Sequence, residues 1–170
     1  MHLISAVEPG HFATLLKQRH PSVEVIGLDP DPKALARARR KAERSGVSVR
    51  FNQGFADTLE YPAAAFDAIF SSFMFHHLEG DVREKSLREV CRVLKPGAAF
   101  YLLDFDVSPS AAGRGPFSLI HSSERLRDNS ESRILSLMDG AGFSHPKKIA
   151  VLPLLFGFGY AALSSVCTQR

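Results

Sequence analysis

The feature that most constrains the fold of this chain is the alternation of short apolar runs with segments of helical periodicity. The apolar runs cover residues 3–7, 23–28, 47–51, 66–72 and 98–105. Helical segments are expected at 11–20, 31–45, 81–93 and 131–141, where apolar side chains recur every three or four residues. This alternation predicts an α/β fold: a Rossmann-like, doubly wound, mostly parallel sheet with helices on both faces.

The end of the chain departs from this alternation. Two apolar runs, at about 147–155 and 158–166, meet at a Gly-Phe-Gly break at 157–159. They predict a C-terminal antiparallel strand pair. A membrane-spanning helix over 149–166 is the alternative, because that segment carries no charge. Its internal glycines and Pro153 favour the two strands, so we expect no stable membrane insertion.

Composition limits the organisation of the chain. With 170 residues, of which 45% are hydrophobic, it is predicted to form a single domain over 1–170 that can bury a core. Cys91 and Cys167 stand far apart in sequence, so neither a disulfide framework nor a zinc site is expected. Unpaired cysteines are typical of a reducing compartment, and we expect a cytoplasmic protein.

Positive charge is concentrated in one predicted helix. Residues 33–44 carry six Lys or Arg and one Glu, a net charge of +5, which leaves −2 for the rest of a chain whose total is +3. Its small apolar residues form the opposite face, so the charges are expected to face water. Since no aromatic residues are interleaved with the charges, we expect no nucleic-acid partner.

In a doubly wound sheet, ligands bind beyond the carboxyl ends of the strands. Asp29 stands at such an end, and an acid there can accept hydrogen bonds from both hydroxyls of a ribose. The alternative is that Asp29 only caps the next helix. Asp31, followed by Pro32 at the first helical turn, already has the capping pattern. We therefore interpret Asp29 as a ribose ligand.

Three segments together resemble a known family. Residues 25–39 resemble the second strand and helix of class I S-adenosylmethionine-dependent methyltransferases, 61–78 their fourth strand and the loop after it, and 87–104 the next helix and fifth strand. The similarity covers nearly the whole chain and is greatest to the branch that includes ubiquinone and menaquinone C-methylases. It implies methyl transfer from S-adenosylmethionine to a small-molecule substrate.

The resemblance also implies a set of cofactor ligands. Asp29 matches the acid on the ribose, and Pro30 stands beside the adenine. Phe55 and Ala56 match the adenine loop, where Phe55 replaces a frequent acid and is expected to stack unless Asp57 turns inward. The loop under the methionine end corresponds to Ser71, Ser72 and Phe73.

The first motif of the family is altered here. Family members have a strand ending in an acid and a Gly-x-Gly-x-Gly turn, whose glycines let backbone N–H groups approach the ligand. In this chain Gly10 takes the third glycine position, and Ala6 and Glu8 take the first two. Gly10 and Glu8 remain cofactor-binding candidates, Glu8 through the amino group of the methionine end.

This altered motif, and the absence of the chain that precedes it in the family, indicate a domain that is short at its N-terminus. Two functions are therefore left open. One is an active methyltransferase. The other is a non-catalytic relative, a truncated isoform or pseudoenzyme, that acts as an interaction or regulatory module.

His76 and His77 are the candidates for acid–base chemistry. One imidazole is suited to orient the substrate or accept a proton near the transferred methyl group. The alternative is a structural hydrogen bond, and adjacent residues are expected to point to different faces. No third ligand stands at metal-binding spacing, so no metal site is expected. Asp104 and Asp106 follow the fifth predicted strand, and a structural role is favoured for both.

Overall fold

The computed structural model describes residues 2–6, 10–106, 130–153 and 159–168. They form one seven-stranded sheet in the order β3-β2-β1-β4-β5-β7-β6. The strands are β1 (His2–Ala6), β2 (Val25–Asp29), β3 (Arg50–Gln53), β4 (Phe66–Ser72), β5 (Leu94–Asp106), β6 (Phe143–Pro153) and β7 (Gly159–Cys167). The helices are α1 (His11–Arg19), α2 (Pro32–Arg44), α3 (Gly80–Val93) and α5 (Glu131–Gly140), with a 3₁₀ turn, η1, at Phe75–His77.

The first five strands are parallel, and β7 lies antiparallel between β5 and β6. This confirms the predicted Rossmann-like fold with its C-terminal antiparallel pair. Strand order reverses at β1, which has β2 on one side and β4 on the other. The point of reversal is where such a sheet offers a ligand site, because the connections leave in opposite directions there.

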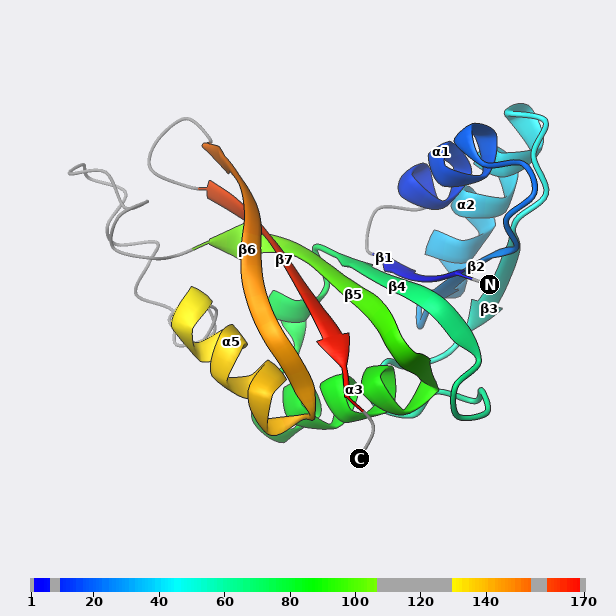
Figure 1. The fold of residues 1–170 in the computed structure, drawn as a ribbon. Helices are drawn as coiled ribbons and strands as arrows, with labels where there is room; N and C mark the ends of the chain where they lie inside the picture. Colours follow the sequence, from blue (N-terminus) through cyan, green and yellow to red (C-terminus); the bar gives the residue numbers. More distant parts are fainter. Residues whose placement is uncertain (1, 7–9, 107–129, 154–158, 169–170) are drawn as a thin grey trace.

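Helices cover both faces of the sheet, as Figure 1 shows, with α1 and α2 at the β2–β3 end and α3 beside α5. Alternate residues of β2 serve the two faces: Val25 packs with α1 and α2, whereas Ile26 and Leu28 belong to the core under α3 and α5. The larger core includes Phe66, Phe100 and Met138 among the described residues, all essentially inaccessible to solvent. Burial on both faces explains why β2 is almost continuously apolar.

The connection from β1 to α1 depends on Gly10. This residue precedes the helix in a left-handed conformation, with φ of +71°, and is buried against α2. A Cβ at this position would lie 2.7 Å from Cβ of Ala38. The close approach of the two helices therefore requires both a small residue at 38 and no side chain at 10.

Strand β5 begins earlier than expected. The apolar run of the sequence begins at residue 98, but the strand starts at Leu94, which pairs with Phe66. The next paired residues are Ala68 and Ala99, so 95–98 bulge out opposite a single residue, Asp67. Gly97, with φ of +78°, accommodates the bulge.

The described parts of the uncharged segment near the C-terminus, 149–153 and 159–166, form strands of an antiparallel pair and not a helix, as predicted. Leu152 pairs with Tyr160 and Lys148 with Leu163. None of the helices in the described ranges combines the length and apolar character needed to cross a membrane.

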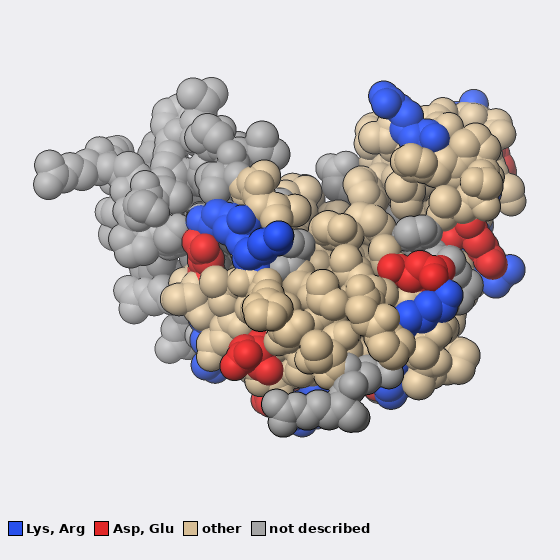
Figure 2. Space-filling model, in the orientation of Figure 1, with Lys and Arg blue, Asp and Glu red and all other residues tan. Residues whose placement is uncertain are grey.

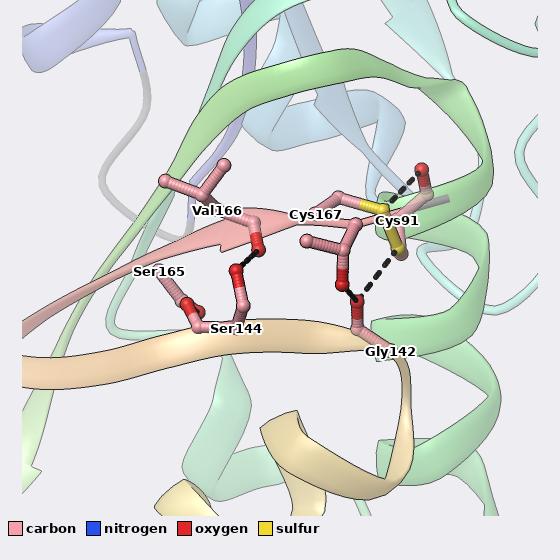
Figure 3. Close-up of a disulfide and its surroundings, with 7 residues drawn as sticks. Cys91, Gly142, Ser144, Ser165, Val166 and Cys167 are labelled. Atoms are coloured by element: carbon pink, nitrogen blue, oxygen red, sulfur yellow. Dashed lines mark hydrogen bonds between the residues drawn. A yellow bond between two sulfur atoms is a disulfide. The ribbon is translucent and has the colours of Figure 1, made fainter. Parts of the chain in front are cut away.

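The expectation that the two cysteines are unpaired is wrong. Cys91 lies in the last turn of α3 and Cys167 at the end of β7, and they form a disulfide with Cα atoms 5.4 Å apart (Figure 3). The neighbouring strands are fastened by two hydrogen bonds, from Ser144 Oγ to the carbonyl of Val166 and from Ser165 Oγ to the carbonyl of Ser144. Sequence separation concealed the contact, because the fold returns β7 to the end of α3.

Replacing Gly10 by Ala should destabilise the protein more than the same change at Gly46. Gly46 has φ of +67°, but a Cβ added there would meet no atom within 4 Å, so Gly46→Ala tests backbone strain alone, about 1–2 kcal/mol. Gly10→Ala adds overpacking against Ala38, worth about 1–3 kcal/mol more. Urea unfolding measures both, and equal losses would contradict the close packing of α1 on α2.

Reduction of the Cys91–Cys167 disulfide should lower the free energy of unfolding by about 2–5 kcal/mol, because it releases a long loop in the unfolded chain. Urea unfolding with and without dithiothreitol measures the change. A Cys91→Ala, Cys167→Ala double variant should not respond to the reductant. A parent protein that is equally indifferent to it would show that the bond does not form in solution.

Candidate functional site

The candidate site is a cavity of about 530 Å³ at the carboxyl ends of the strands on the β2 side of the sheet. It lies between the end of β2, the start of α2, the loop after β3 and the turn after β4. Its lining includes Asp29 and Pro30 with Phe55 and Ala56, four of the cofactor-binding residues predicted from the sequence. The other lining residues are Leu28, Asp31, Ala34, Arg37, Gly54, Asp57, Met74, His77, Leu78 and Val82.

Asp29 is placed at the cavity by the end of β2 and by the cap of α2. Asp31 caps that helix, as predicted, by accepting a hydrogen bond from the backbone N–H of Lys33 at 2.8 Å. Asp29 also makes a local hydrogen bond, since its Oδ1 accepts from the backbone N–H of Asp31 at 2.8 Å. Its other oxygen has no protein partner among the described residues and is available to a ligand.

The environment of Asp29 raises the pKa of its carboxyl group. Burial is the largest cause, and the negative charge of Asp31 acts in the same direction, while the hydrogen bond from the Asp31 N–H and the charge of Arg37 oppose them. A carboxylate that has lost part of its hydration on burial binds hydroxyl donors well, because the hydroxyl groups of a ligand replace the hydrogen bonds to water that burial removed.

The loop after β3 forms the opposite wall. The side chain of Phe55 is 60% exposed although it is a large apolar group, and it lines the cavity beside Asp57. Gly54 lets this loop approach β2, because a Cβ there would lie 2.9 Å from Leu28. An exposed aromatic ring next to a carboxylate is suited to a flat heteroaromatic ring with an amino group.

The three residues expected under the methionine end occupy different environments. Ser71 and Ser72 end β4 and are buried, and Phe73 follows with an unusual φ of +51°. None of the three lines the large cavity. Ser71 lines a separate inner cavity of about 20 Å³ together with Ser86 of α3. Both hydroxyls lack a partner among the described residues, and the space suits one water molecule.

His76 and His77 lie in η1. Their side chains were expected to point to different faces, but they lie side by side. Their rings are in contact, with centroids 3.9 Å apart, because a 3₁₀ turn does not separate neighbours as a strand does. His77 lines the cavity. His76 bonds through Nδ1 to Oδ1 of Asp104 at 2.7 Å, so the structural role predicted for Asp104 includes holding one of the two candidates.

Other predicted residues lie outside the cavity or outside the described part of the chain. Gly10 is buried against α2 and does not line the cavity. Glu8 lies outside the described residues, and so does the side chain of Asp106. Within the described ranges no group of three or more His, Cys, Asp or Glu side chains is arranged to hold a metal ion.

Sequence reasoning missed several residues of the cavity. Met74, Leu78 and Val82 contribute apolar surface, and Arg37 stands at the mouth, 3.9 Å from Asp31. Arg37 lies on the basic helix α2, whose charges were all expected to face water.

On the face shown in Figure 2, lysines and arginines form separate groups with uncharged surface between them.

Comparison with known proteins gives the family. Residues 6–97 match the family model described as a methyltransferase domain. The chain belongs to this methyltransferase domain family. The match runs from the last residue of β1 to the start of β5 and so includes every described element that forms the cavity.

Relatives of this methyltransferase-family chain include two named as demethylmenaquinone methyltransferases. The protein from Thermus thermophilus is 41% identical over 116 residues, which are 68% of this chain and 50% of the relative. The protein from Deinococcus radiodurans is 42% identical over 108 residues, which are 64% of this chain and 43% of the relative. The chain thus spans about half the length of these relatives or less.

Solved structures show the same fold. The YcgJ protein of Bacillus subtilis superposes with a TM-score of 0.72 at 20% identity, over 99% of this chain and 92% of that one. A Haemonchus contortus phosphoethanolamine N-methyltransferase superposes with a TM-score of 0.77 at 15% identity, over 99% and 49%. At this identity the comparison supports the architecture, including the antiparallel strands at the end.

Replacing Asp29 by Asn should stabilise the ligand-free protein at pH 7. Because folding raises the pKa of this acid, the folded protein holds the proton more tightly than the unfolded chain, and stability falls as the pH rises through values above 3.8. The Asn side chain carries no charge, so the free energy of unfolding of the variant should not fall with rising pH in this way. Urea unfolding at pH 7 and below pH 4 measures the difference, which should shrink at the lower pH.

Asp67→Asn is the matched control, because the hydrogen bond from Lys95 lowers the pKa of Asp67 to about 2. The stability from this pair is present above the ordinary pKa and is lost as the pH falls toward 2, so removing the charge should cost a little at pH 7. The cost is small because the pair is exposed. An Asp29→Asn variant less stable than the parent at pH 7 would show that the charge of Asp29 does not destabilise the folded protein.

Proposed function

We propose that the cavity binds S-adenosylmethionine and that the protein transfers its methyl group to a small-molecule acceptor. The observation that carries the proposal is the position of Asp29. This acid ends β2 next to the point where strand order reverses, has one oxygen available, and shares its cavity with the exposed ring of Phe55. That combination suits an adenosine, which presents two ribose hydroxyls and a flat amino-substituted ring.

The residues present fit this group. Asp29 would accept from the ribose hydroxyls, with Pro30 and Ala56 beside the adenine, Phe55 stacked on it and Asp57 within the same wall for its amino group. Glu8 and Gly10, together with Ser71, Ser72 and Phe73, stay assigned to the methionine end by resemblance. When bound, the cofactor supplies an electrophilic methyl group on a sulfonium. The protein's task is then to hold donor and acceptor in line.

For the acceptor we propose a hydroquinone of the demethylmenaquinol type as the first compound to test. The support is the named function of the relatives at 41% and 42% identity. The apolar residues of the turn after β4, with Met74 and Leu78 on the cavity, fit an acceptor that is mostly hydrocarbon. We further propose that residues 1–170 act as one domain without a nucleic-acid partner. A cytoplasmic location stays a proposal, but the Cys91–Cys167 disulfide removes the argument from unpaired cysteines on which it was based.

The non-catalytic alternative uses the same fold and predicts no cofactor binding. No observation on the described residues favours it, since the adenosine half of the cavity retains its acid and its aromatic ring. A measurement of cofactor binding distinguishes this alternative from the enzyme, and it can be made before any acceptor is known.

Calorimetric titration with S-adenosylhomocysteine tests the proposal. We expect binding to the parent, and Asp29→Ala should weaken it by about 10- to 100-fold, because a hydrogen bond to a charged group contributes about 1.5–3 kcal/mol. Phe55→Ala should weaken it by about tenfold through lost stacking. Asp67→Ala, at the other end of β4, is the matched control and should bind as the parent does. A parent without binding heat at millimolar ligand would exclude the cofactor role.

A further inference from the structure

A buried carboxylate and an imidazole meet where β4 and β5 end. Asp104 lies two residues before the end of β5 and is 2% exposed. Its Oδ1 lies 2.7 Å from Nδ1 of His76, and its Oδ2 accepts from the backbone N–H of His76 at 3.2 Å. Both oxygens of the carboxylate are thus directed to one residue on the neighbouring turn.

Fold stability alone is a poor reason for this arrangement. A carboxylate loses several kcal/mol of hydration when it is buried, and a hydrogen-bonded partner only compensates for that loss. Capping the turn requires a bond to the backbone N–H of His76, which Oδ2 makes. The second bond, to the ring, fixes the imidazole and adds nothing that the turn needs.

The turn that carries His76 is held from several sides. Phe73 enters it in a left-handed conformation, with φ of +51°, which a bulky side chain adopts only when its surroundings require it. Phe75 is buried in the core beneath the turn. Arg83 of α3, itself 2% exposed, donates from Nε to the carbonyl of Leu78 at 2.7 Å and places its guanidinium 5.3 Å from the centre of the Phe75 ring. These contacts make the imidazole a preorganised group.

The bond to Asp104 determines which ring nitrogen can accept a proton. In the neutral imidazole, Nδ1 carries the hydrogen because it faces a carboxylate, so Nε2 carries the lone pair. The side chain of His76 is 14% exposed. Its ring packs against that of His77, which lines the proposed cofactor cavity. His76 therefore combines a fixed tautomer with a position next to the site.

We propose that His76 is the base that takes a proton from the acceptor during methylation and that Asp104 is the residue that positions it. This rests on the function proposed above. The acceptor's electron pair forms the bond to the methyl carbon while the carbon–sulfur pair stays on sulfur, which becomes a neutral thioether. The acceptor's proton moves to Nε2 of His76, and Asp104 stabilises the resulting imidazolium.

The substrate class follows from this assignment. An acceptor that needs a base carries a dissociable proton where it reacts or in conjugation with that atom, as a hydroquinone, a phenol or an amine N–H does. A carboxylate or a thioether reacts without losing a proton and would leave His76 without a role.

The first test needs no acceptor. In protein labelled with ¹⁵N-histidine, saturated with S-adenosylhomocysteine and held at pH 8, NMR should show His76 with its proton on Nδ1. Asp104→Asn should shift the tautomer toward Nε2–H, because the amide N–H₂ can donate to Nδ1. A proton on Nε2 in the parent, or no response to Asp104→Asn, overturns the proposal.

The second test is kinetic and uses labelled S-adenosylmethionine with demethylmenaquinol, a simple phenol and benzoate as probe acceptors. His76→Gln should lower kcat by about 100-fold or more, with little change in KM or in the affinity for S-adenosylhomocysteine. Asp104→Asn should lower kcat in the same way. Asp67→Asn, whose carboxylate pairs with Lys95 at the amino end of β4, is the matched control and should keep the parent's kcat.

The outcomes separate this proposal from the one on which it rests. His76→Gln that folds and keeps the parent's kcat overturns the role of His76, whereas cofactor binding and methylation survive. Methylation of benzoate at a rate insensitive to His76→Gln overturns the substrate class. A parent that binds no S-adenosylhomocysteine defeats the proposed function itself. If the parent binds it but methylates no probe, the acceptor is wrong, and the tautomer measurement decides the role of His76.

Discussion

A parallel sheet covered by helices on both faces leaves its polar groups one place to meet a ligand, the ends of its strands. The residues proposed here to bind the cofactor or to react lie at or near these strand ends. Asp29 ends β2, the Phe73–Leu78 turn follows β4, and Asp104 lies near the end of β5. The interior behind them is apolar, and Ile26, Ile69 and Phe100 are nearly inaccessible to solvent. The core makes the sheet rigid, and the rigid sheet fixes the distances at its ends.

The same groups work against the stability of the fold. Burial raises the pKa of Asp29, Asp104 is a buried carboxylate, and Phe73 has a strained backbone. All of them lie at or near the carboxyl ends of β2, β4 and β5, on the two sides of β1 in the sheet order. Features that lower the stability of the folded protein are often concentrated at a binding site. A bound ligand can offset their cost by supplying contacts that the unliganded protein lacks. The parts of β2, β4 and β5 that lie behind these groups, by contrast, carry buried apolar side chains such as Leu28, Phe66 and Leu102.

The sequence predicted the fold well because local signals and tertiary structure agree. The range of β4 was predicted as Phe66–Ser72, and Asp31 with Pro32 marked the start of α2, since strand alternation and capping are local properties. Long-range contacts left no such signal. The Cys91–Cys167 bond joins residues 76 apart, and the His76–Asp104 bond joins residues 28 apart. Arg83 appears in the sequence as one more surface cation of α3, and only the fold shows that it is buried over Phe75.

Asp29 and Phe55 are proposed to frame an adenosine site, and a crystal structure of the protein with S-adenosylhomocysteine would show whether they do. We expect both ribose hydroxyls on the carboxylate of Asp29, the adenine against the ring of Phe55, and the sulfur near the turn that carries His76. A ligand bound elsewhere, or an adenosine in this cavity whose ribose makes no contact with Asp29, would contradict this proposal.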